Sequence, residues 1–221
     1  MLPYSPEAYF GAIARMNAEL AIFVVIAMLL GLFLLALTWW PSLADHKSPQ
    51  AIDRRACLAL AAGWLAAGAV FYGNFLAPLF FAAPWLTGAF AAQAALLFML
   101  AVVRPPPRRH RGGTAGLAGR LLMLYALALV PLLDIAFGPG WPGVRFIGLA
   151  PEPTVAFTAG WLLTRHPDWR TAALALLTVG AGALIAYSAM AWAWLVDAPL
   201  AVAILGAALA AGASGLQNRR A

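Results

Sequence analysis

The sequence predicts an all-α integral membrane protein, and three observations carry this prediction. The chain has 221 residues, of which 64% are hydrophobic and only 10% are charged, far from the balance of soluble domains. Its apolar residues fall in blocks of about 17 to 25, the length that crosses a hydrocarbon core as a helix. The basic residues lie between these blocks, which is typical of the loops that flank membrane spans.

Seven transmembrane helices are expected, preceded by an interfacial helix over residues 1–18, and together they form a single transmembrane domain over residues 1–221. Ser5, Pro6 and Glu7 are a typical helix start, with a hydroxyl N-cap, a proline in the first turn and an acid near the positive end of the dipole. The predicted spans cover residues 19–40, 56–72, 85–103, 116–137, 153–164, 171–192 and 199–215.

The positions of the basic residues predict the orientation of the chain. With seven spans, all 14 lysines and arginines except Arg15 and Arg145 fall on the same side of the membrane. Because basic loops mark the cytoplasmic side, the N-terminus is expected outside and the C-terminus inside. Asp53 and Arg165 are both expected in polar loops on the cytoplasmic side.

Residues 134–165 place charged side chains inside an otherwise apolar context. The predicted fifth span has only ~12 residues, or roughly 18 Å of helix, whereas a hydrocarbon core is about 30 Å thick. We therefore expect a short fifth helix preceded by a loop that dips into the membrane. Irregular backbone is tolerated at that depth only beside protein or a water-filled cavity, so the segment predicts a polar, partly hydrated pocket facing outward.

Asp134, Arg145, Glu152 and Thr154 are the candidate residues of a ligand or ion pocket. Ionisable groups inside a membrane are costly, and they usually pair with one another or line a path. The helix start favours ionised Glu152, whereas burial and the nearby acid oppose ionisation, so one acid is expected to take up a proton near neutral pH. A structural ion cluster that holds the loop in place is an equally consistent interpretation.

Four further polar residues are secondary candidates for the same pocket: Asn17, Glu19, Asn74 and Gln93. Glu19 lies at the edge of the first span, where solvation alone explains a carboxylate. Gln93 is the polar residue inside the third span. Such an amide more often forms a hydrogen bond between helices than binds a solute or an ion.

The residue types that cofactors and metals require are missing from the predicted spans. No span carries a histidine, so axially ligated haem and imidazole metal sites are not expected there, and no span carries a lysine for a retinal Schiff base. Cys57 is the single cysteine. Without a nucleophile–base pair we predict no catalytic residue, no metal, no cofactor and no enzyme activity. The positive charge is attributed to membrane anchoring rather than to nucleic acid.

Two short motifs resemble a known family. They are residues 3–10 followed by Arg15-Met16-Asn17, and residues 146–160. On these motifs, the chain resembles the bacterial membrane family catalogued as domain of unknown function 6064, over essentially its whole length. The family has no settled activity, so the resemblance implies a fold in a bacterial cytoplasmic (inner) membrane and no mechanism.

The chain departs from the family pattern at two positions. Pro-Cys-Pro-Thr is usual where this chain has Pro151-Glu-Pro-Thr154, and a histidine is usual after the residue that corresponds to Tyr72, where Gly73 stands. These departures remove the two residues that would have suggested binding of a soft metal.

Two classes of function remain. The first is a permease- or channel-like protein that handles a small solute or an ion, because transporters use half-length helices whose N-terminal dipole points into the membrane. The alternative is a non-catalytic accessory or assembly subunit of a larger membrane complex. The expected partners are the lipid bilayer and, in the alternative, a membrane protein or a second copy held through Ala/Gly-rich spans 6 and 7, where small residues allow close approach.

Overall fold

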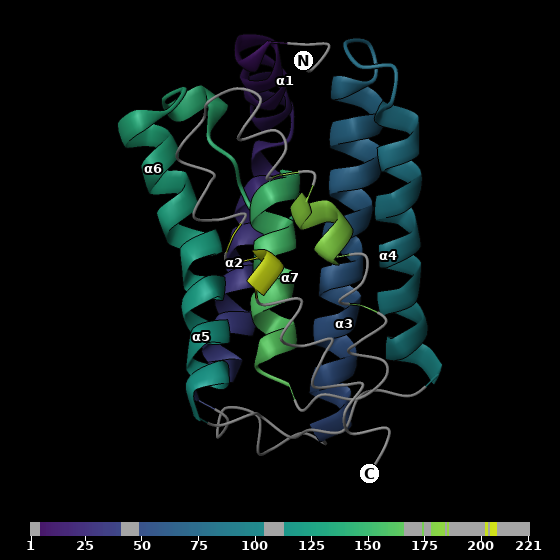
Figure 1. Ribbon diagram of the computed structural model, residues 1–221, viewed down its shortest axis with the longest axis vertical. Helices are drawn as coiled ribbons and strands as arrows, with labels where there is room; N and C mark the ends of the chain where they lie inside the picture. The colour runs from purple at the N-terminus through teal and green to yellow at the C-terminus, as the bar shows by residue number, and fades with distance from the viewer. Residues whose placement is uncertain are drawn as a thin grey trace.

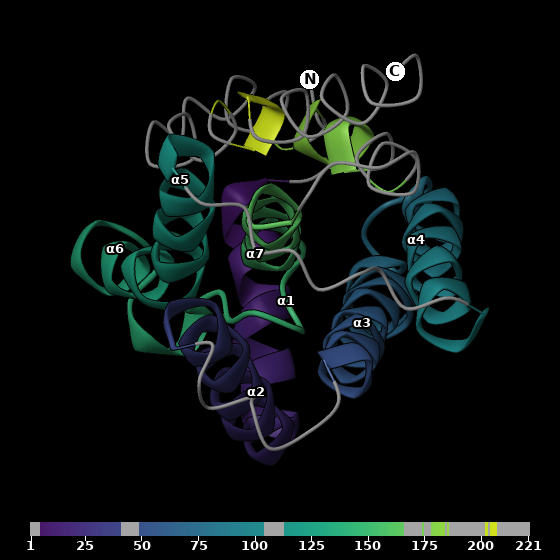
Figure 2. The same ribbon diagram turned by 90° about the horizontal axis from the view of Figure 1, so that it is seen from below.

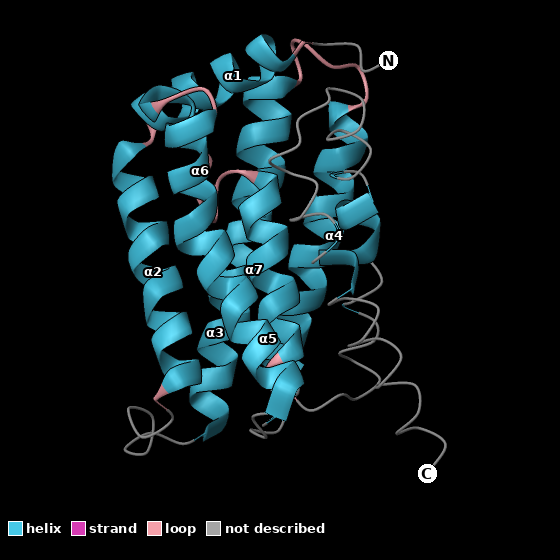
Figure 3. Cartoon of the chain, turned by 60° about the vertical axis from the view of Figure 1, so that its left-hand side comes forward, coloured by secondary structure: helices cyan, strands magenta, loops and turns pink. Residues whose placement is uncertain are grey.

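The computed structural model describes residues 5–40, 49–103 and 113–165, with a few helical positions between 174 and 206. Helices make up nearly all of this part of the chain (Figure 3). Their order is α1 (Pro6–Glu19), α2 (Ala21–Trp39), α3 (Pro49–Ala66), η2 (Ala67–Leu76), α4 (Ala83–Val103), α5 (Gly113–Leu124), η3 (Tyr125–Leu129), α6 (Val130–Phe137), η4 (Trp141–Gly143) and α7 (Pro151–Leu163).

Four of the described helices are long and apolar enough to cross a membrane: Ala21–Trp39, Asp53–Leu76, Ala83–Val102 and Gly113–Phe137, with mean hydropathy between 1.7 and 2.9. They support the prediction of an all-helical, multi-pass membrane protein, and they correspond to the first four expected spans. The sixth and seventh expected spans, 171–192 and 199–215, lie largely outside the described residues.

The second span is longer than its sequence predicts. It was expected to end at Tyr72 because Gly73 and Asn74 follow, yet η2 continues as a π-helix to Leu76. A glycine inside a helix costs only about 0.5–1 kcal/mol, and burial of the side chains of Phe71 and Leu76 outweighs that cost. The Thr87 hydroxyl of α4 also donates a hydrogen bond to the Gly68 carbonyl (3.1 Å) within this segment.

A second π-helical segment, η3, interrupts the helix that runs from Gly113 to Phe137. Pro131 lies two residues after its end, as the second residue of α6. A proline has no N–H for the helical ladder, and its ring collides with the carbonyl group four residues earlier. The wider π-helical turn of η3 accommodates the proline, and it lies directly before α6, the helix that carries Asp134.

Helix α7 forms the centre of the bundle. It has 13 residues, and every one of them is buried, so the helix is about 20 Å long at the α-helical rise. In Figure 2 the helices α2, α3, α4, α5 and α6 are arranged around it. In Figure 1 α7 begins well below the upper ends of α4 and α6.

Helix α1 covers the upper end of the bundle as drawn in Figure 1. It contacts η4 and η2, and its buried face consists of Tyr9, Phe10, Ala12, Ile13 and Met16. Its N-cap is Ser5, as predicted, whose hydroxyl accepts a hydrogen bond from the Ala8 N–H (3.3 Å). Helix α1 therefore packs against η2 and against the segment between α6 and α7.

Helix α2 is attached to the bundle mainly through its lower half. Its buried residues are Gly31, Leu34, Leu35, Leu37 and Thr38. Its upper half exposes large apolar side chains, such as Ile22 at 75% and Phe23 at 59%. This half of α2 separates two cavities, which are described below.

Candidate functional site

The centre of the candidate site is an ion pair between Asp134 on α6 and Arg145 in the loop before α7. The Arg145 guanidinium donates from Nη2 to Oδ1 (2.7 Å) and from Nε to Oδ2 (3.0 Å). The Arg145 main-chain N–H donates to the same Oδ2 (2.9 Å). Asp134 is 0% and Arg145 1% exposed. The two side chains are thus held in a bidentate, dry geometry, the arrangement in which an arginine binds a carboxylate most specifically.

Glu152, in the first turn of α7, connects this helix to α1. The Tyr9 hydroxyl donates a short hydrogen bond to Glu152 Oε1, and both residues are buried. Burial raises the pKa of the Tyr9 phenol well above its usual value, and the negative charge of Glu152 raises it further. The phenol therefore keeps its proton at any physiological pH and remains the donor in this bond.

The two contacts belong to one cluster under α1. The positive charge of Arg145 acts on the Tyr9 hydroxyl, and the guanidinium carbon of Arg145 lies 5.6 Å from the centre of the Phe10 ring, within the range of a cation–π contact. Tyr9 and Phe10 could not be identified as site residues from the sequence, because nothing local distinguishes them from other aromatic residues of an amphipathic helix.

The loop between α6 and α7 is fixed to the rest of the protein by two polar side chains. Asn17 at the end of α1 donates from Nδ2 to the carbonyl groups of Pro142 (3.0 Å) and Val144 (2.7 Å). Thr154 on α7 accepts from the Gly148 N–H (2.8 Å) and donates to the Ala150 carbonyl (2.6 Å). Both candidates from the sequence thus position the loop backbone that carries Arg145.

Gly148 is required at its position in this loop. Its φ of 83° lies in the left-handed region that side chains other than glycine rarely adopt. A Cβ at this position would also lie 3.0 Å from the Cβ of Ala27 on α2. Only glycine at position 148 therefore allows the loop to pass this close to α2 and then lead into α7.

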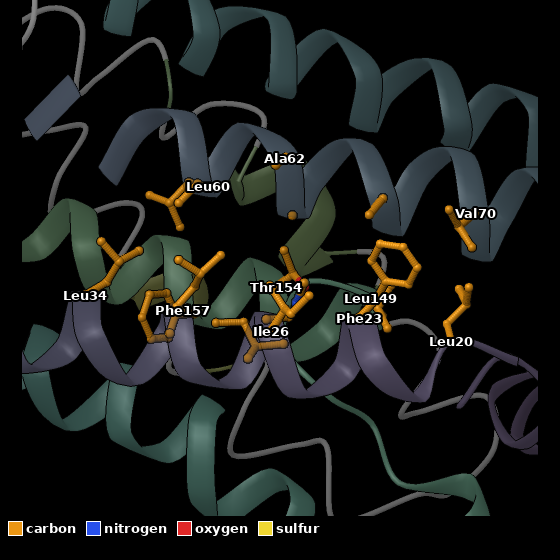
Figure 4. A pocket seen from close by; sticks show the side chains of 18 residues that line it. Leu20, Phe23, Ile26, Leu34, Leu60, Ala62, Val70, Leu149, Thr154 and Phe157 are labelled. Carbon is orange, nitrogen blue, oxygen red and sulfur yellow. The ribbon is translucent and has the colours of Figure 1, made fainter. Parts of the chain in front are cut away.

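Two apolar cavities lie beside the upper half of α2. The first, of about 320 Å³, lies between α2 and α3 and reaches Thr154 and Phe157 of α7 (Figure 4). The second, of about 950 Å³, lies between α2 and the α6 side of the bundle, with Asn17 and Trp141 in its wall. Asp134, Arg145 and Glu152 line neither of these two cavities.

A second buried ion pair lies at the lower end of α7. Arg165 Nη1 donates a short hydrogen bond to Oδ1 of Asp53 on α3, and Arg165 lies over the Trp161 ring with its guanidinium carbon 4.6 Å from the ring centre. Asp53 is 1% and Arg165 6% exposed. Asp53 lies inside α3, so its expected position in a loop is wrong, whereas Arg165 follows the end of α7, where the predicted turn begins. A loop assignment from sequence places a residue near a helix end, and it does not reveal that α7 ends inside the bundle.

The remaining secondary candidates lie apart from the cluster. Glu19 and Asn74 are exposed. Gln93 is buried on α4, where its Nε2 donates to the Leu174 carbonyl (3.3 Å) in the region of the sixth expected span. Gln93 thus joins α4 to the segment around Leu174 by a hydrogen bond.

The described residues hold no group of three or more His, Cys, Asp or Glu side chains that could bind a metal ion. The chemistry available at the cluster is therefore that of fixed charges and hydrogen bonds: an arginine, two carboxylates and a phenol. Such a set can stabilise a charged group or transfer a proton.

Comparison with family models gives one identification: the model of the family of unknown function DUF6064 matches residues 6–220. The chain belongs to the DUF6064 family. No curated protein and no solved structure matches this sequence, so the family contributes no activity by itself.

The two departures from the expected family pattern fall in different surroundings in this DUF6064 protein. Glu152 lies inside the cluster, where its carboxylate accepts from Tyr9. A Cβ at Gly73 would lie 3.7 Å from the Thr87 hydroxyl, so a side chain at this position would point toward α4. Glu152 therefore gives this chain a charge at the start of α7, and Gly73 leaves the contact between η2 and α4 free of a side chain.

Proposed function

We propose that this DUF6064 protein is a permease- or channel-like protein of the bacterial cytoplasmic membrane that handles a small solute or an ion. Its seven spans would place the N-terminus outside and the C-terminus in the cytoplasm. The observation that carries the proposal is α7, a half-length helix enclosed along its whole length. Transporters commonly bind solutes and ions at the ends of such interrupted helices.

The charged residues at the two ends of α7 support this proposal. Arg145 and Glu152 lie at its upper end, and Asp53 and Arg165 form an ion pair at its lower end. Buried charges are costly to maintain inside a membrane, and they are usually found on solute, ion or proton pathways. In this proposal, each set of charges would close one end of α7.

Opening at the upper end would proceed through α1. The contact between Tyr9 and Glu152 joins α1 to α7, and Arg145 under Phe10 adds a second contact. Protonation of Glu152 would replace a charge-assisted hydrogen bond by a weaker neutral one. Movement of α1 would then be coupled to the proton, and a solute could reach the start of α7.

The test is transport by the full-length protein in vesicles. Wild-type protein is reconstituted into proteoliposomes loaded with the pH indicator pyranine, and carboxylic acids, amino acids, amines and inorganic cations are added outside in turn. We expect one class to change the internal pH. Glu152→Gln keeps the shape of the side chain but removes its charge, so it should fold and lose this response, whereas Glu19→Gln should retain it. Retention of the response in Glu152→Gln would overturn the site assignment.

One observation favours the alternative function, an accessory or assembly subunit. The upper half of α2 packs little against the bundle and borders the cavity of about 950 Å³, which a helix of a partner protein could fill. The protein purified alone decides between the two functions. A solute-handling protein should be stable and monodisperse in detergent. An obligate subunit, purified without its partners, should be unstable and aggregate.

A further inference from the structure

The cavity between α2 and α3 is an apolar groove that reaches the centre of the bundle. Figure 4 shows side chains of α2 and α3 on opposite sides, with Thr154 and Phe157 of α7 between them. Its volume of about 320 Å³ is at the lower end of the range of small-molecule sites, roughly 300–1,000 Å³. Its two side walls include Phe23, Ile26, Leu30 and Leu34 of α2, and Ala59 and Gly63 of α3.

Small residues of α3 create this groove. A Cβ at Gly63 would lie 3.4 Å from the Gly148 Cα and 3.7 Å from the Thr154 Cγ2, so the missing side chain opens the space in front of α7. Ala59 and Ala62 continue the same wall. The Thr154 hydroxyl already has an acceptor and a donor within the chain. The groove therefore offers apolar contact and no unfilled hydrogen-bonding capacity at this hydroxyl.

The surroundings of the groove indicate the chemistry of its occupant. Both walls, Ala21–Trp39 and Asp53–Leu76, are candidate membrane spans. Phe23 and Ile26 on the rim are 59% and 47% exposed. A groove between two such helices opens sideways to the hydrocarbon layer, where the abundant molecules are lipid acyl chains.

A positive charge lies at the lower end of the groove. Arg55 is exposed, and it precedes Ala59 and Ala62 by four and seven residues, the spacing of one helix face. Arg54 is exposed as well, but it precedes Cys57 and Ala61 by three and seven residues, and these two are buried in the bundle. Only one of the two neighbouring arginines therefore shares the face of the groove.

We propose that this groove is a binding site for an anionic phospholipid, with one acyl chain between α2 and α3 and the phosphate at Arg55. The dimensions agree with this occupant. Gly63 lies eight residues above Arg55, or about 12 Å along the helix, and half of a hydrocarbon core is about 15 Å. A chain whose headgroup is at Arg55 thus reaches Gly63 and the loop before α7. The site is independent of the proposed solute handling.

The test uses the full-length protein in phosphatidylcholine vesicles that contain a trace of spin-labelled phosphatidylglycerol or, in parallel, spin-labelled phosphatidylcholine. Electron paramagnetic resonance measures the fraction of labelled lipid whose chain is immobilised by the protein. We expect wild type to prefer phosphatidylglycerol about fivefold, the effect of roughly one arginine near a charged headgroup. Arg55→Gln should lose this preference, and the matched variant Arg54→Gln should retain it.

A second pair of variants tests the acyl chain. Ala59→Phe fills the groove and should reduce the immobilised fraction of both lipids, whereas Ala69→Phe, at an exposed position of η2 outside the groove, should leave it unchanged. Equal behaviour of Arg54→Gln and Arg55→Gln would overturn the assignment of the headgroup. An undiminished immobilised fraction in a folded Ala59→Phe would overturn the site as a whole. Both outcomes can be distinguished from failure of the transport proposal, because neither measurement depends on a solute.

Discussion

Gly119 on α5 and Gly160 on α7 face each other at the point where the two helices cross. A Cβ on Gly119 would lie 2.6 Å from the Gly160 carbonyl oxygen, and a Cβ on Gly160 would lie 2.6 Å from the Gly119 carbonyl oxygen. Two glycines thus allow direct backbone contact between α5 and the central helix, as small residues do at helix crossings in membranes. This crossing fixes the depth of α7 and hence the position of Glu152.

We predict that Gly160→Ala destabilises the detergent-solubilised protein by about 1–3 kcal/mol, the usual cost of overpacking, because the neighbour at 2.6 Å is backbone and cannot rotate away. Cys57 provides the measurement. It is the single cysteine and is fully buried, so a thiol-reactive dye that fluoresces on reaction reports the unfolding temperature. Gly88→Ala is the control, since a Cβ there has nothing within 4 Å. Equal unfolding temperatures for the two variants would contradict the close crossing.

The ion pair of Asp134 and Arg145 gives a second prediction. Arg145→Met leaves a buried carboxylate without its cation, and Asp134→Asn leaves a buried guanidinium without its anion; removing one partner of such a pair typically costs about 3–5 kcal/mol. Asparagine keeps an acceptor for the Arg145 main-chain N–H. The double variant should therefore be more stable than the sum of the single losses implies, as a double-mutant cycle measures. Strict additivity would show that the two charges do not stabilise each other.

The orientation gives a third prediction. In a Cys57→Ala background, a cysteine in place of Gly11 on α1 should react with a membrane-impermeant maleimide added to intact cells. Both Gly11 and Thr114 are exposed, but Thr114 lies at the start of α5, at the opposite end of the bundle. A cysteine at Thr114 should react only after the cells are lysed. Reaction of both positions in intact cells would show that the orientation derived from the basic residues is wrong.

The sequence predicts the membrane class and the short central helix because both depend on local composition. Blocks of apolar residues specify the first four spans, and Pro153 places the start of α7 two residues after its observed start at Pro151. Asp134 and Arg145 could be proposed as partners because ionisable residues in an apolar context must find one another. These inferences need only the spacing of residue types along the chain.

The contacts of α1 and of the lower end of α7 depend instead on the packing of distant segments. Tyr9 lies 143 residues from Glu152, and Asp53 lies 112 residues from Arg165. Nothing near Tyr9 in the sequence distinguishes a buried donor from an aromatic residue at a membrane surface. Asp53 follows one polar segment of the sequence and Arg165 precedes another, so the sequence context of both predicts loops. The two side chains meet only because α7 ends beside α3.

The contact between Tyr9 and Glu152 gives a prediction for alkaline pH. Burial and the charge of Glu152 hold the pKa of Tyr9 well above its usual value of about 10. Above pH 10 the unfolded chain therefore releases this proton, while the folded protein still retains it. The contribution of Tyr9 to the free energy of unfolding is therefore fully present below about pH 10. Above that pH the free energy of unfolding falls, by at most about 1.4 kcal/mol per pH unit for one proton.

We expect Tyr9→Phe to be less stable than wild type at pH 7, because hydrogen bonds to charged groups contribute about 1.5–3 kcal/mol. This difference should narrow above pH 10, since only wild type loses the Tyr9 contribution there. The measurement is the unfolding free energy of both proteins in denaturant from pH 7 to 11, with Tyr125→Phe as a control for the removal of a tyrosine outside the cluster. A difference that stays constant across this range would show that Tyr9 does not bind Glu152 as a buried neutral donor.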